Sequence, residues 1–174
     1  MENINNTPRA EASSSIEKLF EPDPRWSIFE GAGSFIEFQK NFLFSECLHS
    51  NADKPLLEQE ILINKLLTYG YFEYEFITVA IRNSFLMFEL GLKIYYKKFT
   101  GTDFQGQLYK LIEAYEKLSI INGENRLVLD MIRHVRNHFT HPKEHTVVAP
   151  AVIEIIKLVV TIINDLEKIL SERN

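Results

Sequence analysis

One stretch of the chain, YFEYEFITVAIRNSFLMFELGLKIYYKK at residues 71–98, limits the possible folds more than any other. It contains no proline and a single glycine, and apolar side chains fall on nearly every side when it is drawn as a helix. Such a helix must be surrounded by other elements, so we predict that it is the central helix of a bundle. Polar residues inside it need partners. Glu89 and Lys93 are four apart in the favourable order and can pair with each other, and Arg82 and Asn83 lie on another face.

The rest of the chain repeats apolar residues at three- and four-residue steps, which is typical of amphipathic helices. Thr102 or Asp103 is the candidate N-cap of the helix that follows the central one. Pro142 disfavours helical geometry at the residue before it, so the helix predicted over about residues 125–139 should end near Thr140. Including the central helix, the predicted helices cover about residues 34–43, 55–70, 71–98, 102–118, 125–139 and 151–170.

These patterns predict an all-α fold, an up-and-down bundle of about five to six helices. The 7 glycines and 6 prolines among 174 residues leave room for few turns, which favours long helices over many short strands. We expect one domain over residues 26–174, preceded by a flexible N-terminal segment at residues 1–25 that is rich in Asn and Ser.

Charge and cysteine content exclude several classes of protein. The net charge of −5 argues against non-specific coating of DNA or of a membrane surface. The single cysteine, Cys47, forms neither an internal disulfide nor a zinc-finger spacing. The N-terminus lacks the pattern of a secretory signal. The most apolar stretch, residues 76–96, is interrupted by charged residues, which argues against a membrane span. The sequence therefore predicts a cytoplasmic protein.

The segment RHVRNHFTHP at residues 133–142 stands out, because four of the 5 histidines lie between positions 134 and 145. From Arg126 to His145, four cationic residues stand against only two acidic ones, which makes a small basic island: Arg126, Arg133, Arg136 and Lys143 against Asp130 and Glu144.

Three interpretations of this histidine-rich segment are open. Basic residues at a helix C-terminus favour the negative end of the helix dipole and need no other role. His134, His138 and His141 have the i, i+4, i+7 spacing of a metal site, although Pro142 pulls the last of them out of regular helical geometry. The third interpretation is phosphodiester cleavage, with Arg136 binding the phosphate and His141 acting as acid or base. Because that reaction uses both an acid and a base, a second copy facing the first would complete the site, which predicts a homodimer.

The segment from Arg136 to Pro142 resembles the Arg-x4-6-His motif of the HEPN superfamily, with a polar residue, Asn137, directly after the arginine. Residues 71–98 are similar to the long core helix of HEPN domains, in which an aromatic and small-residue run precedes a Glu and a Lys. The likeness covers roughly residues 35–170. It implies a small helical bundle that dimerises with its two motifs facing each other.

The resemblance also implies roles for individual residues. Arg136 would hold the scissile phosphate, His141 would do the acid–base work, and Asn137 would orient the site or the RNA backbone. Glu89 would either pair with Arg136 and orient it or pair only with Lys93. Further supporting candidates are His138, which is not a motif position, and Arg133. One HEPN branch has a modifiable Tyr two places after the motif His, where this chain has Lys143, so regulation by that route is not expected.

The activity implied by the resemblance is that of a metal-independent endoribonuclease that forms 2′,3′-cyclic phosphate ends and needs no cofactor. Such proteins act as toxins or antiviral-defence effectors, so the expected partners are RNA, a second copy, and an antitoxin or other defence-system protein. The alternative is a non-catalytic HEPN-like module that binds nucleotide, RNA or protein. Tyr69, Tyr71 and Tyr74 can either stack on RNA bases or pack in the core.

Overall fold

The computed structural model of the chain describes residues 18, 20–43, 47–140 and 148–173. Every regular element within these residues is helical, which confirms the predicted all-α bundle. The elements are, in order, the 3₁₀ turn η1 (Pro24–Ile28) and the helices α2 (Phe35–Phe42), α3 (Lys54–Tyr69), α4 (Glu75–Thr100), α5 (Leu108–Lys117), α6 (Gly123–Thr140) and α7 (Ala149–Arg173). Over the described residues, none of these helices combines the length and the apolar character that crossing a bilayer requires.

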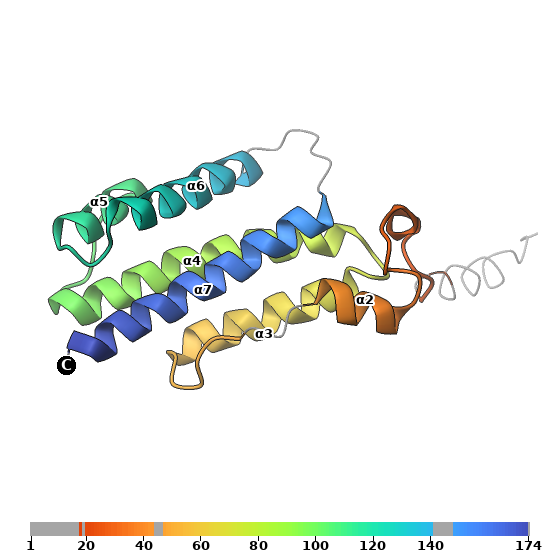
Figure 1. The fold of residues 1–174 in the computed structure, drawn as a ribbon, viewed down its shortest axis with the longest axis horizontal. Helices are drawn as coiled ribbons and strands as arrows, with labels where there is room; N and C mark the ends of the chain where they lie inside the picture. Colours follow the sequence, from red (N-terminus) through yellow and green to blue (C-terminus); the bar gives the residue numbers. More distant parts are fainter. Residues whose placement is uncertain (1–17, 19, 44–46, 141–147, 174) are drawn as a thin grey trace, which may run out of the picture.

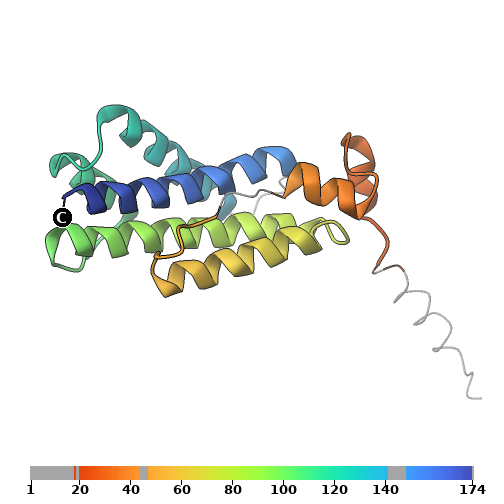
Figure 2. The same ribbon diagram turned by 60° about the horizontal axis from the view of Figure 1, so that its bottom comes forward.

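Helix α4 is the centre of the bundle, as its apolar circumference predicts, because it packs against α3, α5, α6 and α7 (Figure 1). α3 runs antiparallel to α4 and lies alongside it (Figure 2). At one end of this pair Asp53, just before α3, binds Lys98 near the end of α4. At the other end Gly70, just after α3, contacts Ile77 near the start of α4.

Helix α7 runs parallel to α4, and the two lie side by side along the molecule in both views (Figures 1 and 2). The backbone N–H of Ala149, where α7 begins, donates to the Tyr74 hydroxyl at the start of α4 (2.9 Å). Further along, Ile163 of α7 lies against Gly91 of α4. A Cβ at Gly91 would come within 3.0 Å of the Ile163 side chain, so the glycine lets the two helices approach closely.

An aromatic cluster closes the end of the bundle where α2 meets the start of α4. Trp26 of η1 is 1% exposed, and its ring meets Phe38 of α2 edge-on, with ring centroids 4.7 Å apart. Its indole N–H donates to the Gly70 carbonyl (2.8 Å), which satisfies the one polar group of the side chain. Tyr71 and Tyr74 are buried in the same cluster. Core packing, not RNA stacking, is therefore their role.

Two of the predicted helix boundaries were wrong. The central helix begins at Glu75 instead of Tyr71, because Asp23 binds the backbone before it: its N–H donates to the Tyr71 carbonyl and its carboxylate accepts from the Tyr74 N–H. The next helix begins at Leu108 instead of near residue 102. Gly101 and Gly106 have φ angles of 75° and 153°, which a continuing helix excludes.

The loop between α4 and α5 also explains why the predicted N-cap was wrong. The Asp103 carboxylate pairs with Lys97 of α4 (3.0 Å) and caps no helix. Thr102 bonds to Thr100 at the end of α4. Gln107 takes the N-cap position of α5 instead, and its side chain makes no capping hydrogen bond.

Arg25 clamps the N-terminal part of the described chain onto α4. Its guanidinium donates to Asp23 (Nη2–Oδ2 2.7 Å) and to Glu75 at the start of α4 (Nη2–Oε2 2.6 Å). These hydrogen bonds lower the pKa of the nearly buried Asp23 carboxyl to about 2, although burial opposes the shift. The same guanidinium lowers the pKa of Glu75 to about 2.

We expect Asp23→Asn to lower the free energy of unfolding at pH 7 by about 2 kcal/mol, the value that a shift from 3.8 to about 2 represents. The folded-state pKa lies below the unfolded one, so this stabilisation is complete above about pH 4 and is lost as the pH falls through about 2. Urea unfolding of both proteins from pH 7 to pH 2 measures it, and the difference between them should shrink in that window. A difference that is the same at pH 7 and pH 2 would contradict the assignment to this carboxylate.

Candidate functional site

Packing of α6 against α4 positions the arginine of the predicted motif. Ile132 of α6 is buried, and Phe139 packs its ring 5.9 Å from that of Phe85 on α4. Arg136 lies between these two residues along α6, at the edge of the buried face, with its side chain 27% exposed. Because α6 runs antiparallel to α4, the guanidinium emerges one turn further along α4 than Phe85, beside Glu89.

Glu89 binds both of the partners that the sequence offered as alternatives. Arg136 donates from Nη2 to Oε2 of Glu89 (2.8 Å), and Lys93 donates from Nζ to Oε1 (2.7 Å). The Glu89 side chain is 22% exposed, so this ion pair is less screened than one on the open surface. Arg136 makes no further hydrogen bond to a described residue. Its guanidinium therefore keeps donors for an additional anion.

Arg133, one turn before Arg136, is engaged along its own helix. Its Nε donates to Oδ1 of Asp130 (2.9 Å), and its Nη2 lies 2.9 Å from Nε2 of His134. Its Nε and Nη2 are therefore engaged within α6. Arg133 adds positive charge to the site but has fewer guanidinium N–H donors available to a ligand than Arg136 has.

These side chains line a cleft of about 250 Å³ between α4, α6 and the start of α5. Two guanidinium groups and one carboxylate line it. Arg133 also pairs with Asp130 outside the lining, so the donors that Arg136 keeps are what favours an anionic ligand. Of the predicted catalytic and supporting residues, the structure brings Arg136, Asn137, Glu89 and Arg133 together here. The full lining is Glu89, Gln107, Leu108, Tyr109, Arg133, Arg136 and Asn137.

The histidines of the segment are described only in part. His134 contacts Arg133. His138 is exposed and lies edge-on to the neighbouring Phe139 ring, with centroids 6.0 Å apart, and it does not line the cleft. His141, which follows α6 directly in the sequence, and His145 lie outside the described residues, so the predicted convergence of His141 with Arg136 stays a prediction.

Within the described part of the chain, Asp23, Glu73 and Glu75 are the one group of three side chains close enough to share a metal ion. The Arg25 guanidinium lies among these carboxylates, within 3.9 Å of each, and supplies the positive charge that they need. The predicted histidine metal site includes His141 and stays a prediction for that reason.

Two predicted polar residues of α4 do not join the cleft. Asn83 donates to the Val79 carbonyl of its own helix (2.8 Å), and Arg82 is exposed. Conversely, sequence reasoning missed three lining residues, Gln107, Leu108 and Tyr109. The one local signal for them is Gly106, which marks the loop before α5.

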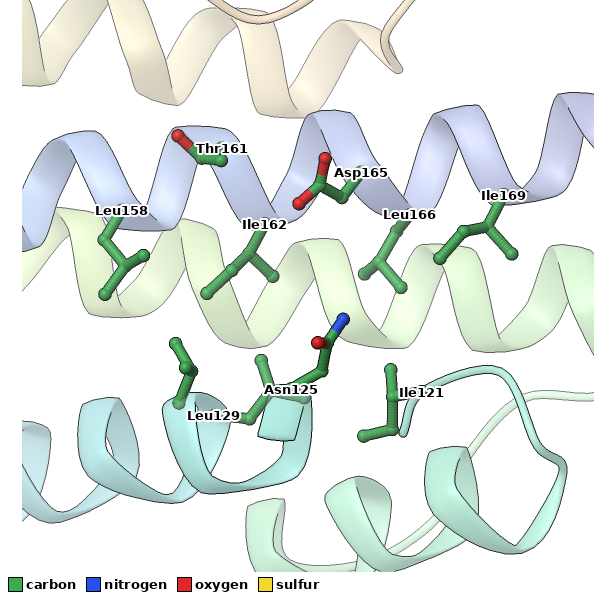
Figure 3. Close-up of a pocket in the computed structure, with 10 residues that line it drawn as sticks. Ile121, Asn125, Leu129, Leu158, Thr161, Ile162, Asp165, Leu166 and Ile169 are labelled. Atoms are coloured by element: carbon green, nitrogen blue, oxygen red, sulfur yellow. The ribbon is translucent and has the colours of Figure 1, made fainter. Parts of the chain in front are cut away.

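A second hollow of about 160 Å³ lies between α6 and α7. Figure 3 shows aliphatic side chains pointing into it from both helices, among them Leu129, Leu158 and Ile162. Its polar lining consists of Asn125, Thr161 and Asp165. Among the described residues no cationic side chain lines it, so this hollow lacks the anion-binding character of the cleft beside Arg136.

Comparison of the chain with protein-family models, with curated proteins and with solved structures gives no match in any of the three.

Proposed function

We propose that the protein is a metal-independent endoribonuclease of the HEPN type that acts as a homodimer. The observation that supports this most strongly is the ion pair between Arg136 and Glu89, which fixes the guanidinium at a cleft with donors to spare. A planar guanidinium matches the oxygens of a phosphodiester. Glu89 in turn is held by Lys93 from the other side, so the arginine is positioned before any ligand arrives.

The proposed reaction begins when one histidine takes the proton of the RNA 2′-hydroxyl. The 2′-oxygen attacks the adjacent phosphorus, the bond to the 5′-oxygen breaks, and a second histidine protonates that leaving oxygen. The products are a 2′,3′-cyclic phosphate and a 5′-hydroxyl. Arg136 stabilises the charge on the phosphate oxygens during the attack. His141 of one protomer and its counterpart on the other supply the two proton transfers, which is why the active unit is a dimer.

Asn137 lines the same cleft. We propose that its amide binds the RNA backbone next to the scissile phosphate. In the cell the enzyme would act in the cytoplasm as a toxin or antiviral-defence effector, with an antitoxin or other defence-system protein as its regulator.

The function is tested with purified protein and an end-labelled single-stranded RNA in excess EDTA. We expect cleavage that continues without divalent metal and leaves 2′,3′-cyclic phosphate and 5′-hydroxyl ends, because histidine and arginine side chains supply all the groups that the reaction uses. Cleavage that appears only when a divalent metal is added would favour the histidine metal site instead.

One observation favours the alternative, a non-catalytic binding module. Both arginines of the cleft are already paired with carboxylates, and among the described residues no histidine lines the cleft. A binding module would leave every RNA intact in the same assay and would still bind RNA or nucleotide in a manner that depends on Arg136.

A further inference from the structure

We propose that the first turn of α5 forms a base-recognition site in the cleft beside Arg136, with Tyr109 stacking on an adenine base and Gln107 reading its edge. This inference rests on the proposed function, because it takes the phosphate bound at Arg136 to be part of RNA. It gives the nuclease a preference for adenine next to the cleaved bond.

The proposed base site and the proposed phosphate site share one cleft. Gln107 and Tyr109 line the same cleft of about 250 Å³ as Arg136. α5 and α6 are antiparallel neighbours, tied near the other end by the ion pair between Arg126 and Glu116. The start of α5 therefore lies opposite the second half of α6. A nucleotide whose phosphate binds Arg136 would therefore have the first turn of α5 within the same cleft.

Tyr109 has the exposure that a stacking residue needs. It is 40% exposed, whereas other large aromatic residues, such as Tyr95 and Tyr115, are fully buried. The ammonium group of Lys110 lies 5.9 Å from the centroid of its ring and adds positive charge beside the ring. Base–aromatic stacking is a common way for proteins to bind unpaired nucleotides.

Gln107 supplies the hydrogen bonds that distinguish one base from another. It is exposed, and although it occupies the N-cap position of α5 its side chain caps nothing. A glutamine amide offers an adjacent donor and acceptor, which match N7 and N6 of adenine. Guanine is instead read by an arginine fork, and Arg133 in this cleft is engaged by Asp130 and His134. The cleft therefore favours adenine over guanine.

The test measures binding of the four nucleoside 3′-monophosphates and of inorganic phosphate to the full chain by calorimetry in EDTA. We expect adenosine 3′-monophosphate to bind tightest. Tyr109→Ala should weaken it by about 5- to 150-fold, the range typical of a lost base–aromatic stack, and leave the affinity for inorganic phosphate unchanged. Tyr109→Phe should bind as wild type does. Gln107→Ala should bring the four nucleotides to similar affinities.

Phe76→Ala is the matched control, because Phe76 is also an exposed aromatic residue (38%) but lies at the start of α4 and does not line the cleft. Equal affinities for the four nucleotides, absence of nucleotide binding, or a Tyr109→Ala protein that binds adenosine 3′-monophosphate like wild type would overturn the base site. RNA cleavage in EDTA, measured on the same preparations, reports the nuclease separately. Cleavage without base preference would refute this inference alone, whereas adenine selectivity without cleavage would refute the nuclease alone.

Discussion

Substitution of His141 by alanine is expected to slow RNA cleavage by about 10²- to 10⁴-fold, the contribution typical of general acid–base catalysis. In the proposed dimer both proton transfers depend on this residue, one in each protomer, so the variant loses the base and the acid together. Initial rates on a defined single-stranded RNA in EDTA measure the effect, and size-exclusion chromatography shows whether the dimer persists.

The matched control for His141→Ala is His145→Ala, which removes an imidazole four positions later that lies outside the motif. It should cleave at the wild-type rate. In cells, expression of the wild-type chain and of His145→Ala should arrest growth, and expression of His141→Ala should not. Equal cleavage by wild type and His141→Ala would show that the acid–base group lies elsewhere.

Arg136→Ala should lower the cleavage rate by about 10²- to 10³-fold, as expected when one preorganised donor to a developing oxyanion is removed. Folding should be affected little, because Glu89 keeps Lys93 as a partner (2.7 Å) and the pair with Arg136 is partly exposed. Arg136→Lys should recover only part of the rate, since an ammonium group cannot bind two phosphate oxygens as a planar fork does.

Arg126→Ala is the control for loss of a positive charge from the same helix. Arg126 pairs with Glu116 of α5 and does not line the cleft. Its removal should leave cleavage unchanged. A similar loss of rate in both arginine variants would mean that the basic island acts only through its overall charge.

The position of α4 could be predicted because its sequence is apolar on almost every side, and only a central helix can bury such a surface. The start of α5 could not. Thr102 and Asp103 have the chemistry of an N-cap, but Gly101 and Gly106, both at positive φ, keep residues 101–107 out of the helix. The backbone conformation of the two glycines therefore overrides the N-cap propensity of Thr102 and Asp103.

The pairing of Glu89 shows a second limit of prediction from the sequence. The four-residue spacing between Glu89 and Lys93 predicts their ion pair from the sequence. The ion pair between Glu89 and Arg136 depends on the packing of α6 on α4, which the sequence does not show. The structure contains both pairs. Gln107 and Tyr109 of the cleft were missed for a related reason. Nothing near them in the sequence indicates that the turn between α5 and α6 folds them back toward Arg136.

The most direct test of the account is whether Arg136 and His141 contact the same phosphate. With 5 histidines in the chain, the imidazole signals can be assigned in NMR spectra by single substitutions. Titration with inorganic phosphate should shift the His141 signal in the wild-type protein, and the shift should disappear in Arg136→Ala. A His141 signal that does not shift on addition of phosphate, or that shifts equally in wild type and Arg136→Ala, would contradict a shared pocket.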